Sequence, residues 1–156
     1  RRDWPVDRFV DYPATPAAWG DLCTALVDGP PPAPYDPADW PAPPFAAFAR
    51  PQAPYAVMHV GASSPLKRWP AERTAHIARL LEDRGIAPVW SGGRGEEAIV
   101  REVDPVERYR SYAGTLDLAQ MWHLVAGARV LVAQDTVIAH LGRIVGTPTV
   151  ALFGPG

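Results

Sequence analysis

The stretch that decides the fold is Arg129-Val130-Leu131-Val132-Ala133-Gln134-Asp135-Thr136-Val137-Ile138-Ala139-His140-Leu141. Its first six residues read as a short apolar strand, and Asp-Thr then opens a helix. A second apolar run, residues 149–154, follows Gly146-Thr147-Pro148. A strand that ends in Asp-Thr before a helix gathers backbone N–H groups and a short polar side chain, and open α/β sheets bind phosphorylated ligands at such places. The alternative is that Asp135 or Thr136 only caps the helix.

Size and composition exclude several classes of protein. The chain has 156 residues, one cysteine (Cys23), a net charge of −2 and a pI near 6.1. One domain of ordinary size is expected, and bulk charge argues against a partner that is a nucleic acid. A single cysteine excludes an intrachain disulfide and favours a reducing compartment. No apolar run approaches the roughly 20 residues of a transmembrane segment. Because the first residue is Arg1 and the last strand is followed at once by the end of the chain, we expect a piece of a longer protein.

Proline divides the chain into two unequal parts. Of 19 prolines, 13 lie in residues 1–54, a density that a helix or central strand does not tolerate. We expect this part to be a connector with one short helix over residues 17–27, where apolar residues recur at helical spacing. Several aromatic side chains in or beside it favour docking on a surface over free disorder.

From residue 55 onward, apolar runs alternate with helical patterns. Strands are predicted at 55–60, 86–90, 109–113, 130–133 and 149–153, and helices after 70, from 96, over 116–126 and after 135. The third helix is predicted to have Thr115 or Asp117 as its cap, and the residues predicted to face inward are Leu118, Met121, Trp122 and Val125. This order predicts a Rossmann-like α/β domain over 55–156, a parallel sheet with helices on both faces. Ligands of such folds bind beyond the carboxyl ends of the strands.

The loop after the first strand carries the parts of a phosphate site. It offers the hydroxyls of Ser63 and Ser64 and the side chain of Lys67, the only lysine among 15 basic residues, ahead of a helix N-terminus. It lacks the spacing of a Walker loop. An ordinary polar connection is the alternative.

Three further loops open at the same edge. After the second strand, Glu96 follows a glycine turn, either as a favourable partner of the helix dipole or as an acceptor for ribose hydroxyls. Thr115 and Leu116 form either a capped turn or a contact for a flat base. Thr136 and His140 are four residues apart on one helix face, with Asp135 at the helix start. His59, His76 and His123 fit structural or solvated positions.

Together these loops resemble glycosyltransferase family 9, the ADP-heptose:lipopolysaccharide heptosyltransferases and their relatives. The resemblance covers roughly residues 55–156 in order. It rests on 59–64, 67–70, 91–93, 113–115, 126–128, 135–136 with 140–141, and 146–155. It implies the C-terminal, donor-binding domain of a GT-B fold. An N-terminal acceptor domain of the same protein would be the partner and would contribute the general base, so no catalytic residue is expected in this chain.

The resemblance also implies roles for single residues. Ser63, Ser64 and Lys67 would contact the diphosphate, and Glu96 the ribose. Thr115 and Leu116 would lie beside the base. Asp135 would hold hydroxyls of the sugar, and Thr136 would face the phosphates, with His140 in the same motif. The family commonly has glycine after the Asp-Ser/Thr pair, where this chain has Val137, and this puts the geometry of donor binding in question.

The reaction implied is inverting, metal-independent transfer of a heptose-like sugar from a nucleoside diphosphate sugar, with an ADP-sugar favoured, to a glycan or lipopolysaccharide-type acceptor. No other cofactor is implied. The location would be cytoplasmic, either free or peripheral at the inner face of the membrane. The alternatives are a non-catalytic nucleotide-binding module and an interaction domain. A dehydrogenase is disfavoured because the dinucleotide glycine pattern is incomplete.

Overall fold

The computed structural model describes residues 14, 19–27, 30, 33–52 and 54–153. The chain divides into two compact units, residues 1–36 and 37–156. In the first unit, α1 (Trp19–Val27) confirms the helix predicted in this region, except that residues 17 and 18 lie outside the described part. Whether the functional boundary falls at residue 54 or elsewhere stays a prediction.

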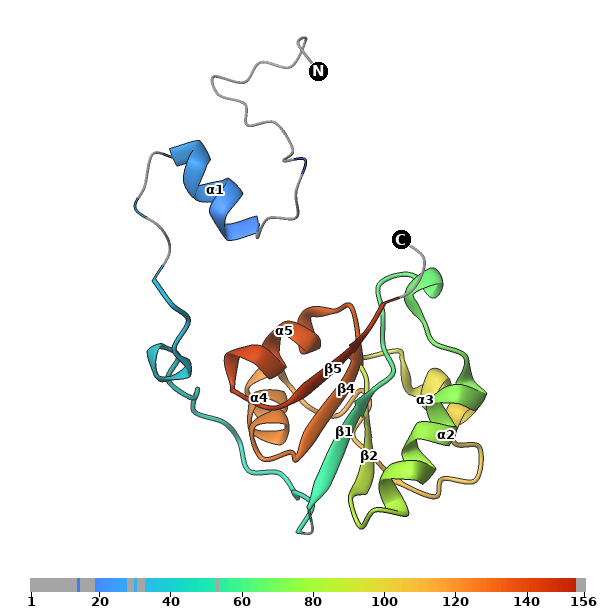
Figure 1. Ribbon diagram of the computed structural model, residues 1–156. Coiled ribbons are helices and arrows are strands. Elements are labelled where there is room, and N and C mark those ends of the chain that lie inside the picture. The colour runs from blue at the N-terminus through green and yellow to red at the C-terminus, as the bar shows by residue number, and fades with distance from the viewer. Residues whose placement is uncertain (1–13, 15–18, 28–29, 31–32, 53, 154–156) are drawn as a thin grey trace. The chain divides into compact units, whose positions relative to one another are not determined.

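The second unit is the predicted alternation of strands and helices (Figure 1). A short 3-10 turn, η1 (Pro37–Asp39), comes first. The remaining elements in chain order are β1 (Tyr55–His59), η2 (Pro65–Lys67), α2 (Ala71–Glu82), β2 (Ala87–Ser91), α3 (Glu97–Val103), β3 (Arg110–Ser111), α4 (Leu118–Ala126), β4 (Val130–Gln134), α5 (Val137–Ile144) and β5 (Thr149–Leu152).

The five strands form one parallel sheet in the order β3-β2-β1-β4-β5. The chain moves outward from β1 through β2 to β3, and then returns to continue on the other side of β1 with β4 and β5. The loops after β1 and β4 therefore run to opposite faces of the sheet. Such a reversal of strand order opens a crevice at the carboxyl ends, which is where ligands of this fold class bind.

Two apolar layers cover the sheet, with α4 and α5 on one face and α2 and α3 on the other (Figure 1). Successive residues of β1 pack into opposite apolar layers, because the side chains of a strand point to its two faces in turn. Val57 belongs to the layer under α4 and α5, and Met58 to the layer under α2 and α3. Both side chains are at most 1% exposed.

Two predictions about this unit were wrong in detail. The predicted strand over 109–113 has only two paired residues, Arg110 and Ser111. Of the two caps considered for the third helix, Asp117 is confirmed, so the helix begins at Leu118 rather than at 116: the Asp117 carboxylate accepts a hydrogen bond from the backbone N–H of Gln120, and the Gln120 side chain accepts one from the N–H of Asp117. As the first helical residue, Leu118 is 64% exposed rather than directed inward.

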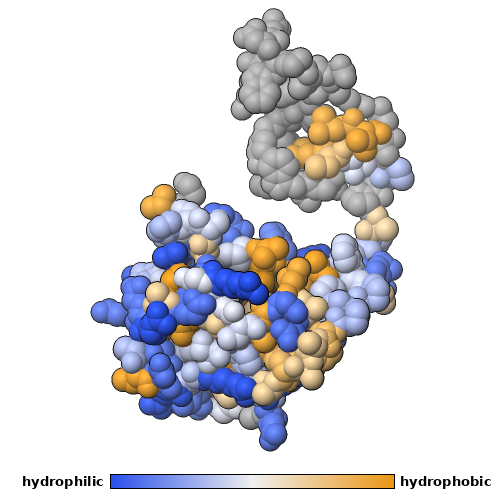
Figure 2. All heavy atoms as spheres, turned by 180° about the vertical axis from the view of Figure 1, so that it is seen from behind, coloured by the Kyte–Doolittle hydropathy of each residue, from blue (hydrophilic) through white to orange (hydrophobic). Residues whose placement is uncertain are grey.

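The residues before β1 form a strap on α4, defined here as residues 43–50. Its backbone carbonyls accept hydrogen bonds from His123 Nε2 (Pro43, 2.8 Å), Gln120 Nε2 (Ala46, 3.1 Å) and the Tyr112 hydroxyl (Ala49, 2.7 Å). The Phe45 ring stacks on His123 with a centroid distance of 3.8 Å. Part of the proline-rich region is thus docked. Figure 2 shows a largely hydrophilic face of this unit, with hydrophobic atoms gathered toward one side.

Candidate functional site

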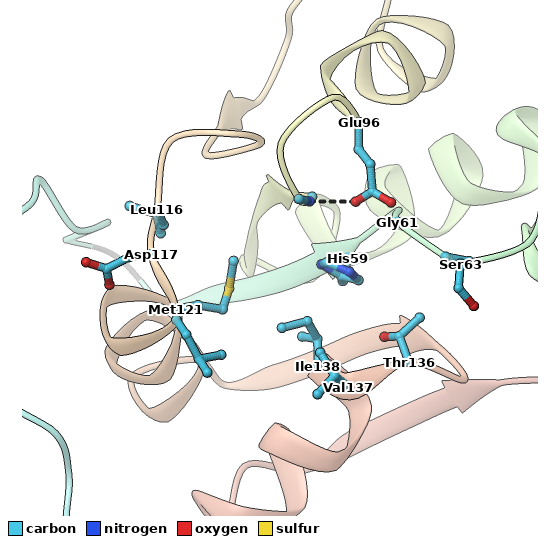
Figure 3. A pocket seen from close by; sticks show the side chains of 14 residues that line it. His59, Gly61, Ser63, Glu96, Leu116, Asp117, Met121, Thr136, Val137 and Ile138 are labelled. Atoms are coloured by element: carbon cyan, nitrogen blue, oxygen red, sulfur yellow. Dashed lines mark hydrogen bonds between the residues drawn. The ribbon is translucent and has the colours of Figure 1, made fainter.

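A pocket of about 420 Å³ opens at the carboxyl edge of the sheet (Figure 3). All four loops that the sequence singled out contribute to it. Its lining residues are His59, Gly61, Ala62 and Ser63 after β1; Gly92, Gly93 and Glu96 after β2; Leu116, Asp117, Leu118 and Met121 around the start of α4; and Thr136, Val137 and Ile138 after β4. Four of the nine predicted site residues are therefore brought together here, namely Ser63, Glu96, Leu116 and Thr136.

The two ends of the pocket differ in chemistry. In Figure 3, Leu116 and Met121 lie toward one end, Ser63 and Thr136 toward the other, and Glu96 and His59 between them. The first end has apolar walls suited to a flat base, and the second offers hydroxyl groups beside a helix N-terminus. An elongated ligand with an apolar ring and an anionic tail matches this order of groups.

Glu96 is fixed by its own loop. Its Oε2 accepts a hydrogen bond of 2.5 Å from the backbone N–H of Gly93. The carboxylate also lies against the backbone of Gly61, where a β-carbon would come within 2.6 Å of Oε1. Only glycine at position 61 leaves room for the carboxylate in this place, so the loops after β1 and β2 depend on each other for their geometry.

Lys67 and Asp135 are not pocket-lining residues but form an ion pair beside it. Lys67 Nζ lies 2.8 Å from Asp135 Oδ2, and both side chains are 41% exposed. The hydrogen bond from Lys67 is the main cause that holds the pKa of the Asp135 carboxyl below its ordinary value, and His140 adds a smaller electrostatic contribution. The structure thus pairs the cation predicted for phosphate with the carboxylate predicted for sugar hydroxyls.

Thr136 stands at the N-terminus of α5. Its backbone is the N-cap, yet its side chain makes no capping hydrogen bond. Its hydroxyl oxygen is buried and has no hydrogen-bond partner among the described residues. A buried hydroxyl without a partner costs free energy, so this group is available to a ligand at the helix N-terminus. Val137, the next residue, also lines the pocket and is 69% exposed.

The other predicted site residues are not among the residues that line this pocket. The Ser64 hydroxyl accepts a hydrogen bond from the Leu66 N–H and caps η2. The Thr115 hydroxyl donates to the Tyr112 carbonyl at 2.9 Å. His140 is exposed on α5. Whether a ligand recruits any of the three stays a prediction.

His59 is the pocket residue whose position the sequence interpretation undervalued. It is the last residue of β1, 8% exposed, and its Nδ1 lies 3.0 Å from the Ser91 hydroxyl at the end of β2. Burial lowers the pKa of the ring to about 4, partly opposed by the negative charge of Glu96. The available signal was its place at the carboxyl end of a central strand, where this fold class binds ligands.

The described residues contain no group of three or more His, Cys, Asp or Glu side chains arranged for a metal ion. Among the helices of the described part, none is both long enough and apolar enough to cross a membrane.

Comparison with known proteins decides the family. The sequence profile of glycosyltransferase family 9 (heptosyltransferase) matches residues 29–156. The chain belongs to this family. Lipopolysaccharide heptosyltransferase 1 of Pseudomonas aeruginosa is 34% identical over 111 residues, which are 70% of this chain and 31% of that protein.

Solved structures of the family have the same fold. The Escherichia coli ADP-heptose lipopolysaccharide heptosyltransferase II matches with a TM-score of 0.62 and 29% identity, over 67% of this chain and 34% of that one. An E. coli heptosyltransferase solved with ADP-2-deoxy-2-fluoro heptose matches at 0.63 over 87% of this chain and 44% of that one, but at 22% identity it bears on the fold alone. The chain spans about a third of the length of the curated relatives it matches.

Proposed function

We propose that this chain forms the donor-binding part of an inverting, metal-independent glycosyltransferase. The complete protein would move a heptose-like sugar from a nucleoside diphosphate sugar, with an ADP-sugar favoured, to a glycan or lipopolysaccharide-type acceptor. The observation that carries the proposal is the single pocket shared by Ser63, Glu96, Leu116 and Thr136, four residues from four separate loops. Membership of family 9 supports the class of reaction.

The donor would lie along the pocket from its apolar to its polar end. The base would pack against Leu116, and the ribose hydroxyls would donate to Glu96. The diphosphate would meet the Ser63 hydroxyl, the unpartnered Thr136 hydroxyl and the N–H groups at the start of α5. Hydrogen-bond donors that are already in place are the means by which such sites stabilise a charged leaving group.

The pair between Lys67 and Asp135 would open when the donor binds. Phosphate oxygens would replace the Asp135 carboxylate on the ammonium group, and Asp135 would become free to accept hydrogen bonds from hydroxyls of the sugar. Both residues are partly exposed, so the exchange requires no change in the core. Lys67 would then balance the negative charge that develops on the departing diphosphate.

In the reaction, the acceptor hydroxyl oxygen would form a bond to the anomeric carbon while the bond to the diphosphate oxygen breaks. A general base would take the hydroxyl proton. We assign that base to an N-terminal acceptor domain of the same protein and expect little or no transfer by the 156-residue chain alone. The proposed location, cytoplasmic or peripheral at the inner face of the membrane, rests on the lipopolysaccharide acceptors named for the relatives.

Calorimetry with ADP-, UDP- and GDP-sugars, with and without added metal ions, tests the proposal. The unaltered chain should bind one class without metal, and Lys67→Ala should lower that affinity by about tenfold or more, since a hydrogen bond to a charged group contributes about 1.5–3 kcal/mol. Arg79→Ala is the matched control, because it removes one positive charge from the exposed face of α2. No binding of any nucleotide sugar by the unaltered chain would refute the proposal.

Two further results bear on the class of protein. Sugar transfer by the purified 156-residue chain would show that the base lies within it. Binding of a nucleotide sugar by the complete protein, without transfer to any glycan acceptor, would instead favour a non-catalytic nucleotide-binding module.

A further inference from the structure

His59 occupies a place in the pocket that the proposed donor contacts do not use. Its ring lies between Glu96 and the residues at the start of α5 (Figure 3). One ring nitrogen, Nδ1, is paired with the Ser91 hydroxyl at 3.0 Å. The other, Nε2, has no hydrogen-bond partner among the described residues. A polar atom at the wall of a ligand pocket with no partner in the protein is available to the ligand.

The surroundings of Ser91 determine which ring nitrogen carries the proton. Ser91 is completely buried, and the contact with His59 is the only hydrogen bond that its hydroxyl makes among the described residues. If Nδ1 donated to Ser91, the hydroxyl proton would have no acceptor, and a buried donor without a partner is costly. The hydroxyl therefore donates to Nδ1, and in the neutral ring the proton resides on Nε2.

The ring also stays neutral at physiological pH. Burial lowers the pKa of His59 to about 4, so the imidazole carries no charge near pH 7. A neutral N–H can donate to an anionic oxygen near the Glu96 carboxylate without placing a charged imidazolium in a buried position. Phosphate oxygens only accept hydrogen bonds, whereas ribose hydroxyls can also donate to Glu96, so the phosphate is the better match for this N–H.

We infer that His59, held by Ser91, is a further ligand-binding residue that donates its Nε2–H to an oxygen of the phosphate next to the ribose in a bound nucleoside diphosphate. This inference rests on the proposed function and adds a contact to it. It gives Ser91 the role of a positioning residue, which touches no ligand but selects the form of the ring that can donate into the pocket.

Titrations of the 156-residue chain with ADP and with adenosine test the inference. His59→Asn keeps an amide near the position of Nδ1 but loses the donor at Nε2, and should lower ADP affinity about tenfold while adenosine affinity stays within about twofold. His59→Gln places an amide nitrogen near the position of Nε2 and should restore most of the ADP affinity. His76→Asn, on the exposed face of α2, is the control and should change neither affinity.

A second measurement does not depend on the folding of a variant. A long-range proton–nitrogen NMR spectrum of the unaltered chain should show the Nε2–H form of His59, and its Nε2 signal should move with ADP but not with adenosine. Ser91→Ala should give a mixture of the two neutral forms and a smaller loss of ADP affinity than His59→Asn.

The possible results distinguish a failure of the proposed function from a failure of the inference about His59. If the unaltered chain binds neither ADP nor any nucleotide sugar, the proposed function is refuted, and the inference with it. If it binds ADP but His59→Asn weakens ADP and adenosine equally, or weakens neither, only the inference is refuted. An Nδ1–H ring in the spectrum refutes the inference by itself.

Discussion

The narrow space between Gly61 and Glu96 gives the sharpest test of the pocket geometry. A β-carbon on Gly61 would lie 2.5 Å from Cδ and 2.6 Å from Oε1 of Glu96. Carbon and oxygen atoms that are not bonded settle at about 3.5 Å, and Oε2 of Glu96 would be closer still to this β-carbon, so Gly61→Ala must push the carboxylate away by about 1.5 Å. Gly61 is not one of the glycines with a positive φ, and the three atoms nearest to a built β-carbon all belong to the Glu96 carboxylate.

The expected effect falls on binding rather than on stability. The atoms displaced are the free end of a flexible side chain, so the cost is that of one strained rotamer and a weakened hydrogen bond to Gly93, about 1 kcal/mol. A displaced carboxylate no longer meets the ribose. Loss of one charged hydrogen bond costs about 1.5–3 kcal/mol, which lowers ADP affinity by roughly 10- to 100-fold.

Calorimetry with ADP and with 2′,3′-dideoxy-ADP measures this effect. Gly61→Ala should reduce ADP binding toward the level of the dideoxy compound and leave the dideoxy compound nearly unchanged. Gly85→Ala is the matched control: Gly85 has a φ of +73° and nothing within 4 Å of a built β-carbon, so alanine there costs about 1–2 kcal/mol without touching the pocket. If Gly61→Ala binds ADP as tightly as the unaltered chain does, Glu96 is not the ribose contact.

Three other predictions concern the ion pair, the core and the buried histidine. Asp135→Asn should raise the affinity for ADP, because Lys67 no longer has a carboxylate partner. It should lower the affinity for the ADP-sugar, because the carboxylate proposed to bind the sugar hydroxyls is lost. Calorimetry that shows both affinities moving in the same direction would contradict the proposed exchange of partners by Lys67. Leu124→Ala should lower the free energy of unfolding by about 3 kcal/mol, because Leu124, a residue of α4, is fully buried in the apolar layer on that face of the sheet, and a loss under about 1.5 kcal/mol in urea titrations would contradict the packing described. The pKa of His59 is lowered to about 4 from 6.5, so the unfolded chain takes up the proton first as pH falls. The contribution of the neutral ring to the free energy of unfolding is fully present above pH 6.5. It is lost progressively as the pH falls to 4, by roughly 3 kcal/mol in total. His59→Gln should abolish this dependence in urea titrations between pH 4.5 and 7, and an unchanged slope would refute it.

The fold was predictable because local patterns and packing agree. The apolar run of β4, the Asp-Thr pair and the helix of α5 follow one another in the chain, and each has the period that its element requires. Because the carboxyl ends of parallel strands lie at one edge, the alternation of elements was enough to predict that Ser63, Glu96 and Thr136 come together. Leu118 was predicted to face inward, but the helix begins two residues later than predicted. With Asp117 as the N-cap, Leu118 is the first helical residue and stays exposed ahead of the turns that pack on the sheet.

The contacts within the site could not be predicted in the same way. Lys67 and Asp135 are separated by 68 positions, and both fit phosphate and sugar roles on chemical grounds, so nothing local indicates that they pair with each other. The same holds for His59 and Ser91, which meet because β1 and β2 pair in the register that places them side by side. Pairings between distant segments depend on strand register, and the apolar pattern of a strand does not specify which polar residues face each other across it.

The strap over residues 43–50 has a consequence for which substitutions this chain can tolerate. Each of its three hydrogen bonds to the domain ends on a backbone carbonyl of the strap, which every amino acid possesses, and proline lacks only the N–H group. These hydrogen bonds therefore depend on the path of the chain rather than on its side chains, whereas the rings of Phe45 and Phe48 make side-chain contacts with His123 and Tyr112. Substitutions at the other positions of the strap should be nearly neutral as long as the path is kept. The residues that must be retained for this contact are those on the opposite side, Tyr112, Gln120 and His123.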